Sequence, residues 1–313
     1  MKRAFNISGR EIVCFLLLAI IASGCQSLNA INITTTIPPN VDNIRDGSSL
    51  NKGGSVKIIG NNVNNSPTAY VTAVQDPSKK LWYLTTNLWA VQTAEGSVSM
   101  EYTGAGKLII NADLRIINGT FGGYPSIIYG RSPWSKTIAS DQTAKFPMQI
   151  KQMQKLTCLT NYSLVFSKIG GNIAYDLWLT ETQLPCDPSN GVEVMIWFFR
   201  NNNGPQGSFI GESIKEITIN DIVTNRKFLV FVERKSPTRN WDVVTYMIDD
   251  QQAVPSGKIE IDLLDYVKSA LVAIARSEEL YLQGVEFGVE FTNQNQDFTF
   301  ELNQFNIDQD LCP

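Results

Sequence analysis

Residues 191–199 divide their side chains between two faces, and this division constrains the fold more than any other feature of the chain. In a β-strand, successive side chains point to opposite faces of the sheet. One face of this segment therefore carries Glu193, Met195 and Trp197, and the other carries only apolar side chains. An unpaired carboxylate in a dry core costs several kcal/mol. The segment is predicted to be a strand whose acidic face lines a cleft.

Two other segments have the same design. In residues 282–291, Glu286 and Glu290 alternate with Val and Phe, and in residues 175–180, Asp176 lies on the face opposite three apolar side chains. Residues 175–180 come soon enough before residues 191–199 for the two strands to form a hairpin, which would bring two carboxylates together. Asp176 is then either a helper of the nearby glutamate, because close carboxylates push their pKa values apart, or a hydrogen-bonded surface acid.

A glycine at position 288 interrupts the second of these strands. Glycine weakens a strand interior and often marks the close approach of a ligand or of another backbone, so we expect the Glu290 face to border a groove. Two carboxylates that face each other across such a groove, here Glu193 and Glu290, are the recurring apparatus of glycoside hydrolysis. Glu286 shares the face of Glu290 and is the competing acid.

The composition excludes several classes of function. The 313 residues include no histidine, which rules out Ser-His-Asp and Cys-His nucleophiles and histidine-ligated zinc. The net charge of −4, without any basic run, argues against nucleic acid as a partner. A neutral polysaccharide fits better, because sugars pack their C–H faces on aromatic rings. The candidate rings are Trp82, Trp89, Tyr124, Trp134, Trp178, Trp197 and Trp241.

Short apolar runs recur along most of the chain and are separated by turn residues. They are residues 55–59, 107–110, 163–166, 228–231 and 297–302. This pattern predicts an all-β sandwich of antiparallel sheets in a single domain. One helix is expected at about residues 262–276, where apolar residues recur at helical spacing behind an Asp cap.

The first residues read as a targeting segment. Lys2, Arg3 and Arg10 precede the apolar run 12–22 and a small-residue site that ends at Cys25, as in a secretory leader. We therefore expect a leader over 1–25, a polar tether over 26–54 and a catalytic domain over 55–313, in a secreted protein. The alternative to simple cleavage is lipoprotein processing, in which Cys25 would be acylated and would tether the protein to a membrane.

Three cysteines follow the leader. Cys158 and Cys186 flank the Asp176 strand, and an extracellular site favours oxidation, so we predict a disulfide between them. The alternative is that Cys158, Cys186 and Cys312 are buried or free thiols.

Several motifs resemble glycoside hydrolase family 12, the endo-β-1,4-glucanases and xyloglucanases with a concanavalin-like β-jelly-roll fold. The resemblance rests on Glu-x-Met-Ile-Trp at 193–197, Gly-x-Glu at 288–290 behind Tyr-Leu at 281–282, Tyr-Asp-Leu-Trp at 175–178, Asn-x-Trp at 87–89 and a Tyr-Pro segment at 123–130. The motifs occur in this order over most of the mature chain. Ala90, where the family usually has Gly, and residues 291–293 depart from the pattern.

The resemblance implies a retaining mechanism. Glu193 would be the nucleophile, Glu290 the acid/base, and Asp176 would hydrogen-bond to Glu193 and orient it. The residues expected to bind substrate are Asn87, Trp89, Tyr124, Met195, Trp197 and Pro205 of a Pro-x-Gly loop.

We therefore expect a monomeric endo-β-1,4-glucanase that needs no metal or organic cofactor and acts on cellulose or a related β-glucan. A xyloglucan-specific hydrolase of the same fold is one alternative. A concanavalin-like carbohydrate-binding protein without turnover is another, for which the aromatic groove would suffice. Two acids on separate strands favour the enzyme.

Overall fold

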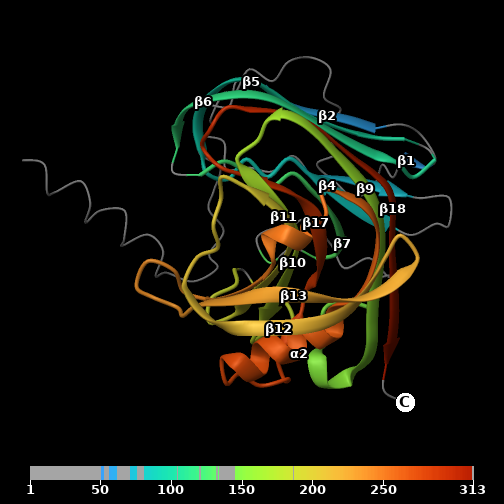
Figure 1. The fold of residues 1–313 in the computed structure, drawn as a ribbon, viewed down its shortest axis with the longest axis vertical. Helices are drawn as coiled ribbons and strands as arrows, with labels where there is room; N and C mark the ends of the chain where they lie inside the picture. The colour runs from blue at the N-terminus through green and yellow to red at the C-terminus, as the bar shows by residue number, and fades with distance from the viewer. Residues whose placement is uncertain are drawn as a thin grey trace, which may run out of the picture. The chain divides into compact units, whose positions relative to one another are not determined.

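The computed structural model describes residues 51–52, 56–61, 71–75, 81–103, 105–119, 121–131, 133, 145–185 and 187–311, which form a sandwich of β-strands with one α-helix (Figure 1). The strands are β1 (Asn51–Lys52), β2 (Val56–Asn61), β3 (Val71–Gln75), β4 (Leu81–Thr85), β5 (Val91–Tyr102), β6 (Leu108–Gly119), β7 (Ser126–Gly130), β8 (Met148–Gln149), β9 (Met153–Lys168), β10 (Gly171–Thr180), β11 (Val192–Asn201), β12 (Ser208–Ile219), β13 (Ile222–Glu233), β14 (Asp242–Ile248), β15 (Ser256–Asp262), β16 (Tyr281–Leu282), β17 (Gly284–Phe291) and β18 (Gln296–Leu311). The helix is α2 (Leu263–Ala273), and two short 3-10 turns are η1 (Ile150–Gln152) and η2 (Asp250–Gln252).

Nine strands form one layer, which we call the inner layer. Its hydrogen-bonded order is β3-β4-β7-β17-β10-β11-β14-β13-β12. The outer layer runs β15-β9-β18-β6-β5-β2. The last residues of β12 pair with β15, so the two layers are continuous at one edge. The predicted all-β sandwich is confirmed, and each of the five predicted strand segments overlaps a strand of the structure, most of which are longer than predicted.

Two pairings differ from the predicted antiparallel arrangement. The short β1 pairs with β3 in parallel, and β11 pairs with β14 in parallel. The chain leaves β11, passes through the β12–β13 hairpin and returns as β14 beside β11. This crossover makes the two strands run in the same direction.

The strand alternation separates two apolar clusters on the two faces of the inner layer. The main core between the layers takes one side chain in two from the central strands, including Tyr175, Ile196 and Phe287. The smaller cluster, Ala174, Met195, Trp197 and Met247, lies on the opposite face. Because adjacent residues of one strand belong to different clusters, the side chains on the second face do not belong to the main core.

The predicted helix is confirmed as α2, although it ends three residues earlier than expected, at Ala273. The carboxylate of Asp262 caps it by accepting hydrogen bonds from the backbone N–H groups of Leu264, at 3.0 Å, and Asp265, at 3.4 Å. Ala275 has a positive φ of 54°, which ends the helical geometry.

The leader at 1–25 lies outside the described residues, as does nearly all of the tether at 26–54. Asn51 and Lys52 are the exception: they pair with β3, so the sheet begins shortly before the expected domain start. Among the described residues, no helix combines the length and the apolar character needed to cross a bilayer. Cys158 is a buried thiol on β9, next to the hydroxyl of Tyr175. Cys186 and Cys312 lie outside the described residues, so the pairing of Cys158 with Cys186 stays a prediction.

The glycine at 288 reflects the close approach of another backbone. A Cβ atom built there would lie 2.2 Å from the carbonyl oxygen of Pro125 and 2.8 Å from Cα of Ser126. These atoms belong to the segment that pairs with β17 through β7. Of the two expected reasons for this glycine, backbone packing is therefore the one observed.

We predict that Gly288→Ala destabilises the protein by about 1–3 kcal/mol, because the new methyl group meets backbone atoms that cannot move independently. Thermal unfolding measures the effect. Gly204→Ala is the matched control, since no atom lies within 4 Å of its added Cβ. Equal melting temperatures for the two variants would contradict this account.

Candidate active site

Three adjacent strands of the inner layer carry the predicted acids on one face, which we call the acidic face. Asp176 in β10 lies opposite Met195 of β11 and Glu286 of β17. Glu193 lies two residues before Met195 on β11, and Glu290 lies two residues after Gly288 on β17, so both are on the same face as Asp176. Glu193 and Glu290 are both partly exposed. The fold therefore brings acids from distant parts of the sequence onto one accessible surface.

The carboxylate of Glu193 is held by a tryptophan. The indole Nε1 of Trp241 donates a hydrogen bond to Oε2 of Glu193 at 2.9 Å. Burial raises the pKa of Glu193 to about 7, whereas the hydrogen bond from Trp241 and the positive charge of Arg239 oppose that rise. Both neighbours favour the ionised form of Glu193, which is the form a nucleophile needs.

Glu290 has an amide as its partner. Nδ2 of Asn172, directly opposite in β10, donates to Oε2 of Glu290 at 2.7 Å. Burial raises the pKa of Glu290 to about 7 against the effect of this hydrogen bond, and the charge of Glu193 raises it further. When Glu193 is ionised, Glu290 therefore tends to keep its proton. The two carboxyl groups influence each other electrostatically, as an acid and a nucleophile must.

Asp176 differs from its expected role in one respect. Its Oδ2 accepts a hydrogen bond from Nε1 of Trp178 at 3.1 Å, and its buried Oδ1 has no partner among the described residues. The expected hydrogen bond to Glu193 is thus replaced by two separate tryptophan contacts, and the rings of Trp178 and Trp241 meet edge to face at 5.6 Å. Burial, and next the charge of Glu193, raise the pKa of Asp176 well above its usual value.

Glu286 is the competing acid, and its surroundings argue against a direct role. Its side chain is only 4% exposed and accepts a hydrogen bond from Oγ of Ser126 at 3.3 Å. It lies between β10 and β7 in the sheet. Glu290 is the more accessible of the two, so a ligand on the acidic face reaches Glu290 more readily.

The predicted sugar-binding residues at the β4 end of the layer occupy different depths. Trp89 is 49% exposed and stacks on Phe121 at 5.7 Å, which leaves a ring face for a ligand. Asn87 adopts a φ of 37° at the bend before it, and its carbonyl oxygen accepts the backbone N–H of Tyr124. Tyr124 itself is 3% exposed and donates its hydroxyl to the carbonyl oxygen of Ala174. Tyr124 therefore lies near the acids, whose charges raise its pKa after burial does, but presents no exposed ring.

The residues expected beside Glu193 lie on the acidic face with it. Met195 and Trp197 belong to the small apolar cluster, and Nε1 of Trp197 is buried without a partner among the described residues. A buried donor without an acceptor costs about 1–3 kcal/mol. Trp197 Nε1 and Oδ1 of Asp176 are thus a buried donor and a buried acceptor that no described residue satisfies. Pro205 lies partly buried in the loop between β11 and β12.

Three neighbours of the two glutamates are not predicted as such by the sequence. Trp241 and Asn172 hydrogen-bond to them and Arg239 acts through its charge; Trp241 is only one of the candidate rings, and Asn172 and Arg239 belong to no motif. The one available signal was that Asn172 lies four residues before Asp176 and therefore on the same face of its strand. Trp241 and Arg239 come from the β13–β14 connection, whose position depends on the crossover.

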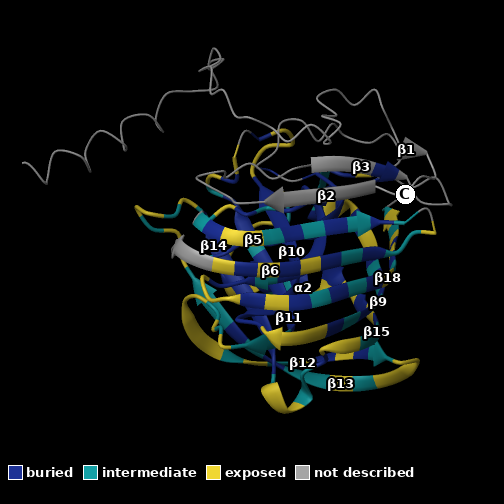
Figure 2. Ribbon diagram, turned by 90° about the horizontal axis from the view of Figure 1, so that it is seen from above, coloured by how far each residue is buried: buried dark blue, intermediate teal, exposed yellow. Residues whose placement is uncertain are grey.

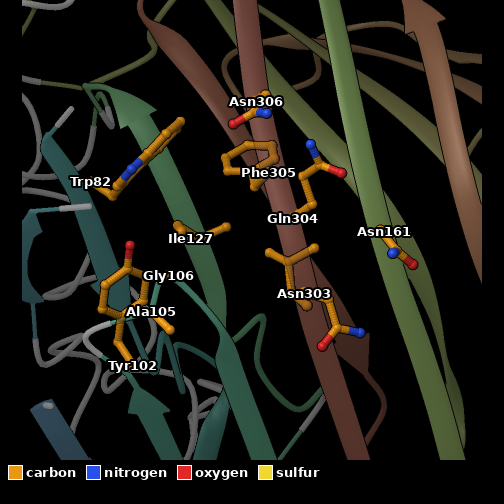
Figure 3. Close-up of a pocket in the computed structure, with 11 residues that line it drawn as sticks. Trp82, Tyr102, Ala105, Gly106, Ile127, Asn161, Asn303, Gln304, Phe305 and Asn306 are labelled. Carbon is orange, nitrogen blue, oxygen red and sulfur yellow. The ribbon is translucent and has the colours of Figure 1, made fainter. Parts of the chain in front are cut away.

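A partly open pocket lies elsewhere in the molecule (Figure 3). It has a volume of about 360 Å³ and is lined by aromatic, aliphatic and amide side chains that include Trp82, Ile127, Gln304 and Phe305. Its described lining holds no carboxylate, so it lacks the chemistry of the acidic face. Among the described residues, no group of three His, Cys, Asp or Glu side chains is arranged to hold a metal ion.

Comparison with known proteins agrees with this geometry. The family model described as Glycosyl hydrolase family 12 matches residues 80–310. Endoglucanase S of Pectobacterium parmentieri is 28% identical over 171 residues, which cover 53% of this chain and 59% of that protein. The chain thus spans less than two thirds of this relative's length.

Solved structures share the fold at low sequence identity. An endoglucanase from Rhodothermus marinus is 19% identical, with a TM-score of 0.62 over 82% of this chain and 100% of the other. A family 12 xyloglucanase from Bacillus licheniformis, solved with a ligand, is 17% identical, with the same TM-score and the same coverage. The family match extends over most of the chain, and it contains Asp176, Glu193 and Glu290. This chain belongs to glycosyl hydrolase family 12.

Proposed function

We propose that the protein is a retaining endo-β-1,4-glucanase. The observation that carries the proposal is the pair Glu193 and Glu290 on one accessible face, where burial raises the pKa of each to about 7 and the charge of Glu193 further raises the pKa of Glu290. Family membership supports glycoside hydrolysis, and the names of the relatives include endoglucanases.

The mechanism follows from the two environments. Glu193, held ionised by Trp241 and Arg239, attacks the anomeric carbon and forms a glycosyl–enzyme ester while the glycosidic bond breaks. Glu290 transfers its proton to the departing oxygen. In the second step Glu290, now a carboxylate, takes a proton from water as the water oxygen attacks the same carbon, which releases Glu193. Atoms and charge balance without any cofactor.

A β-glucan chain suits the rest of the face. Trp89 offers an exposed ring for a sugar face, and the partly exposed carboxyl groups of Glu193 and Glu290 can reach the sugar from the same layer. The acids lie in the middle strands of the layer, with further strands on both sides, which favours cleavage within a chain over removal of its end. A xyloglucanase among the structural neighbours keeps xyloglucan as the alternative substrate.

We also propose that the protein is secreted as a monomer. The alternative to free release is that an acylated Cys25 holds it on a membrane. The support for secretion is the leader-like composition of residues 1–25.

We predict that Glu193→Gln lowers kcat on soluble β-glucan by at least about 10³-fold, because the amide cannot form the glycosyl ester. A reducing-sugar assay on carboxymethylcellulose and mixed-linkage glucan measures the loss. Wild-type protein that binds these glucans without releasing reducing ends would instead support the carbohydrate-binding alternative.

A second experiment assigns the acid. Azide should restore activity to Glu290→Ala on an activated aryl β-cellobioside, because that leaving group departs without a proton and the small anion then attacks the glycosyl enzyme without a general base. It should not do so for Glu286→Ala, whose side chain is buried beneath the face. The reverse pattern would assign the acid/base role to Glu286.

We predict that Trp241→Phe moves the acidic limb of the kcat/KM pH profile upward by about one unit. The reason is that a hydrogen bond to a charged group contributes about 1.5 kcal/mol or more, and about 1.4 kcal/mol corresponds to one pKa unit. The bond stabilises ionised Glu193, so its loss raises the pKa of the nucleophile, and activity then disappears at a higher pH as the solution is acidified. The basic limb of the profile, set by the pKa of Glu290, should remain at the same pH. Unfolding curves check that the variant is folded, and an unshifted acidic limb would contradict the role of Trp241.

A further inference from the structure

The apolar part of the acidic face continues beyond the catalytic strands in a straight row. Met195 of β11 pairs with Thr245 of β14, Thr245 with Phe231 of β13, and Phe231 with Phe209 of β12. Directly paired residues have their side chains on the same face. The row therefore leads from the residue beside Asp176 to the far edge of the inner layer.

Packing contacts confirm that the row is continuous. Leu229 and Phe231 pack against the cluster of Met195, Trp197 and Met247. Phe209 meets Phe231 edge to face, with ring centroids 5.6 Å apart. The apolar surface next to the nucleophile thus extends without a break to Phe209.

Phe209 is exposed at the end of this row. Its side chain is 55% accessible, and its neighbour Ile210 is also exposed. A register shift between Phe209 and Gly211 marks a bulge, and β12 pairs with β15 only at Thr218 and Ile219. The first part of β12 is therefore an edge, and Figure 2 shows exposed and half-exposed segments along β12 and β13. Exposed apolar side chains on a sheet edge are an aggregation liability unless they bind something.

We propose that Phe209, supported by Phe231, forms an outer subsite that binds a glucosyl unit of a long β-glucan chain. The subsite extends the proposed glucanase function and rests on it. Phe209 lies three strands from Met195, or about 14 Å at the usual strand spacing. This distance is beyond the two sugars that flank the scissile bond. In the strand order of the layer, the acids lie between Phe209 and Trp89, so the chain would pass over the acids from one exposed ring to the other.

The chemistry of the row favours a sugar over a charged partner. Its members Met195, Thr245, Phe231 and Phe209 carry no charge, and an aromatic ring binds the C–H face of a pyranose without requiring any. Continuity with the catalytic residues favours the substrate itself over an unrelated partner. A second copy of this chain, paired through the β12 edge, is the competing occupant.

The test measures binding in the Glu193→Gln background, so that the substrate is not consumed. Calorimetry with cellotriose and cellohexaose gives the ratio of the two affinities. Phe209→Ala should reduce the ratio of cellohexaose affinity to cellotriose affinity by about tenfold, the amount expected for one lost aromatic contact. Phe209→Trp should keep this ratio. Ile222→Ala is the control, because Ile222 is an apolar residue at the far end of the same hairpin and is even more exposed than Phe209.

Two outcomes would overturn the subsite. One is an affinity ratio that Phe209→Ala leaves unchanged. The other is a dimer, seen by light scattering, that Phe209→Ala converts to monomers without loss of cellohexaose affinity. The reducing-sugar assay on the wild-type protein is separate, so failure of the glucanase function and failure of the subsite give different results.

Discussion

A β-strand presents alternate side chains to opposite faces. In β10, β11 and β17 of the inner layer, one face packs in the main core and the other carries the acids. On one face Tyr175, Ile196 and Phe287 build the main core. On the other face Asp176, Glu193 and Glu290 form the reactive surface. The register of the core therefore also sets the register of the acids. A slip of one residue in β11 would move Glu193 into the core and Val194 onto the acidic face, so stability and catalysis depend on the same pairing.

Burial governs the electrostatics of this surface. It is the largest cause of the raised pKa values of Asp176, Glu193 and Glu290. What distinguishes the two glutamates is their neighbours: an indole N–H and a guanidinium beside Glu193, and an amide and a nearby carboxylate beside Glu290. In the proposed mechanism, these different short-range contacts separate the roles of nucleophile and acid within the same low-dielectric surroundings.

Those contacts come from segments that local patterns describe poorly. Asn172 lies on the strand of Asp176, but its pairing with Glu290 depends on the β10–β17 register. Trp241 and Arg239 belong to the connection that leads into β14, the strand that pairs in parallel with β11. The expected bond between Asp176 and Glu193 came from family resemblance, and the structure gives each of these acids its own tryptophan. Phe209 had no motif to mark it and is significant only as the end of a cross-strand row.

The sequence by itself determined the all-β class, the single helix, the acids and the family, because alternation, capping and short motifs are local and depend on neighbours a few residues apart. Tertiary structure decided which side chains meet the acids, which predicted sugar-binding rings are exposed, and how far the apolar face extends. These properties depend on strand order and on the β11–β14 crossover, which bring together residues far apart in the chain. Tyr124 shows the difference: its motif was recognisable from the sequence, but only packing against β10 shows that its ring is buried.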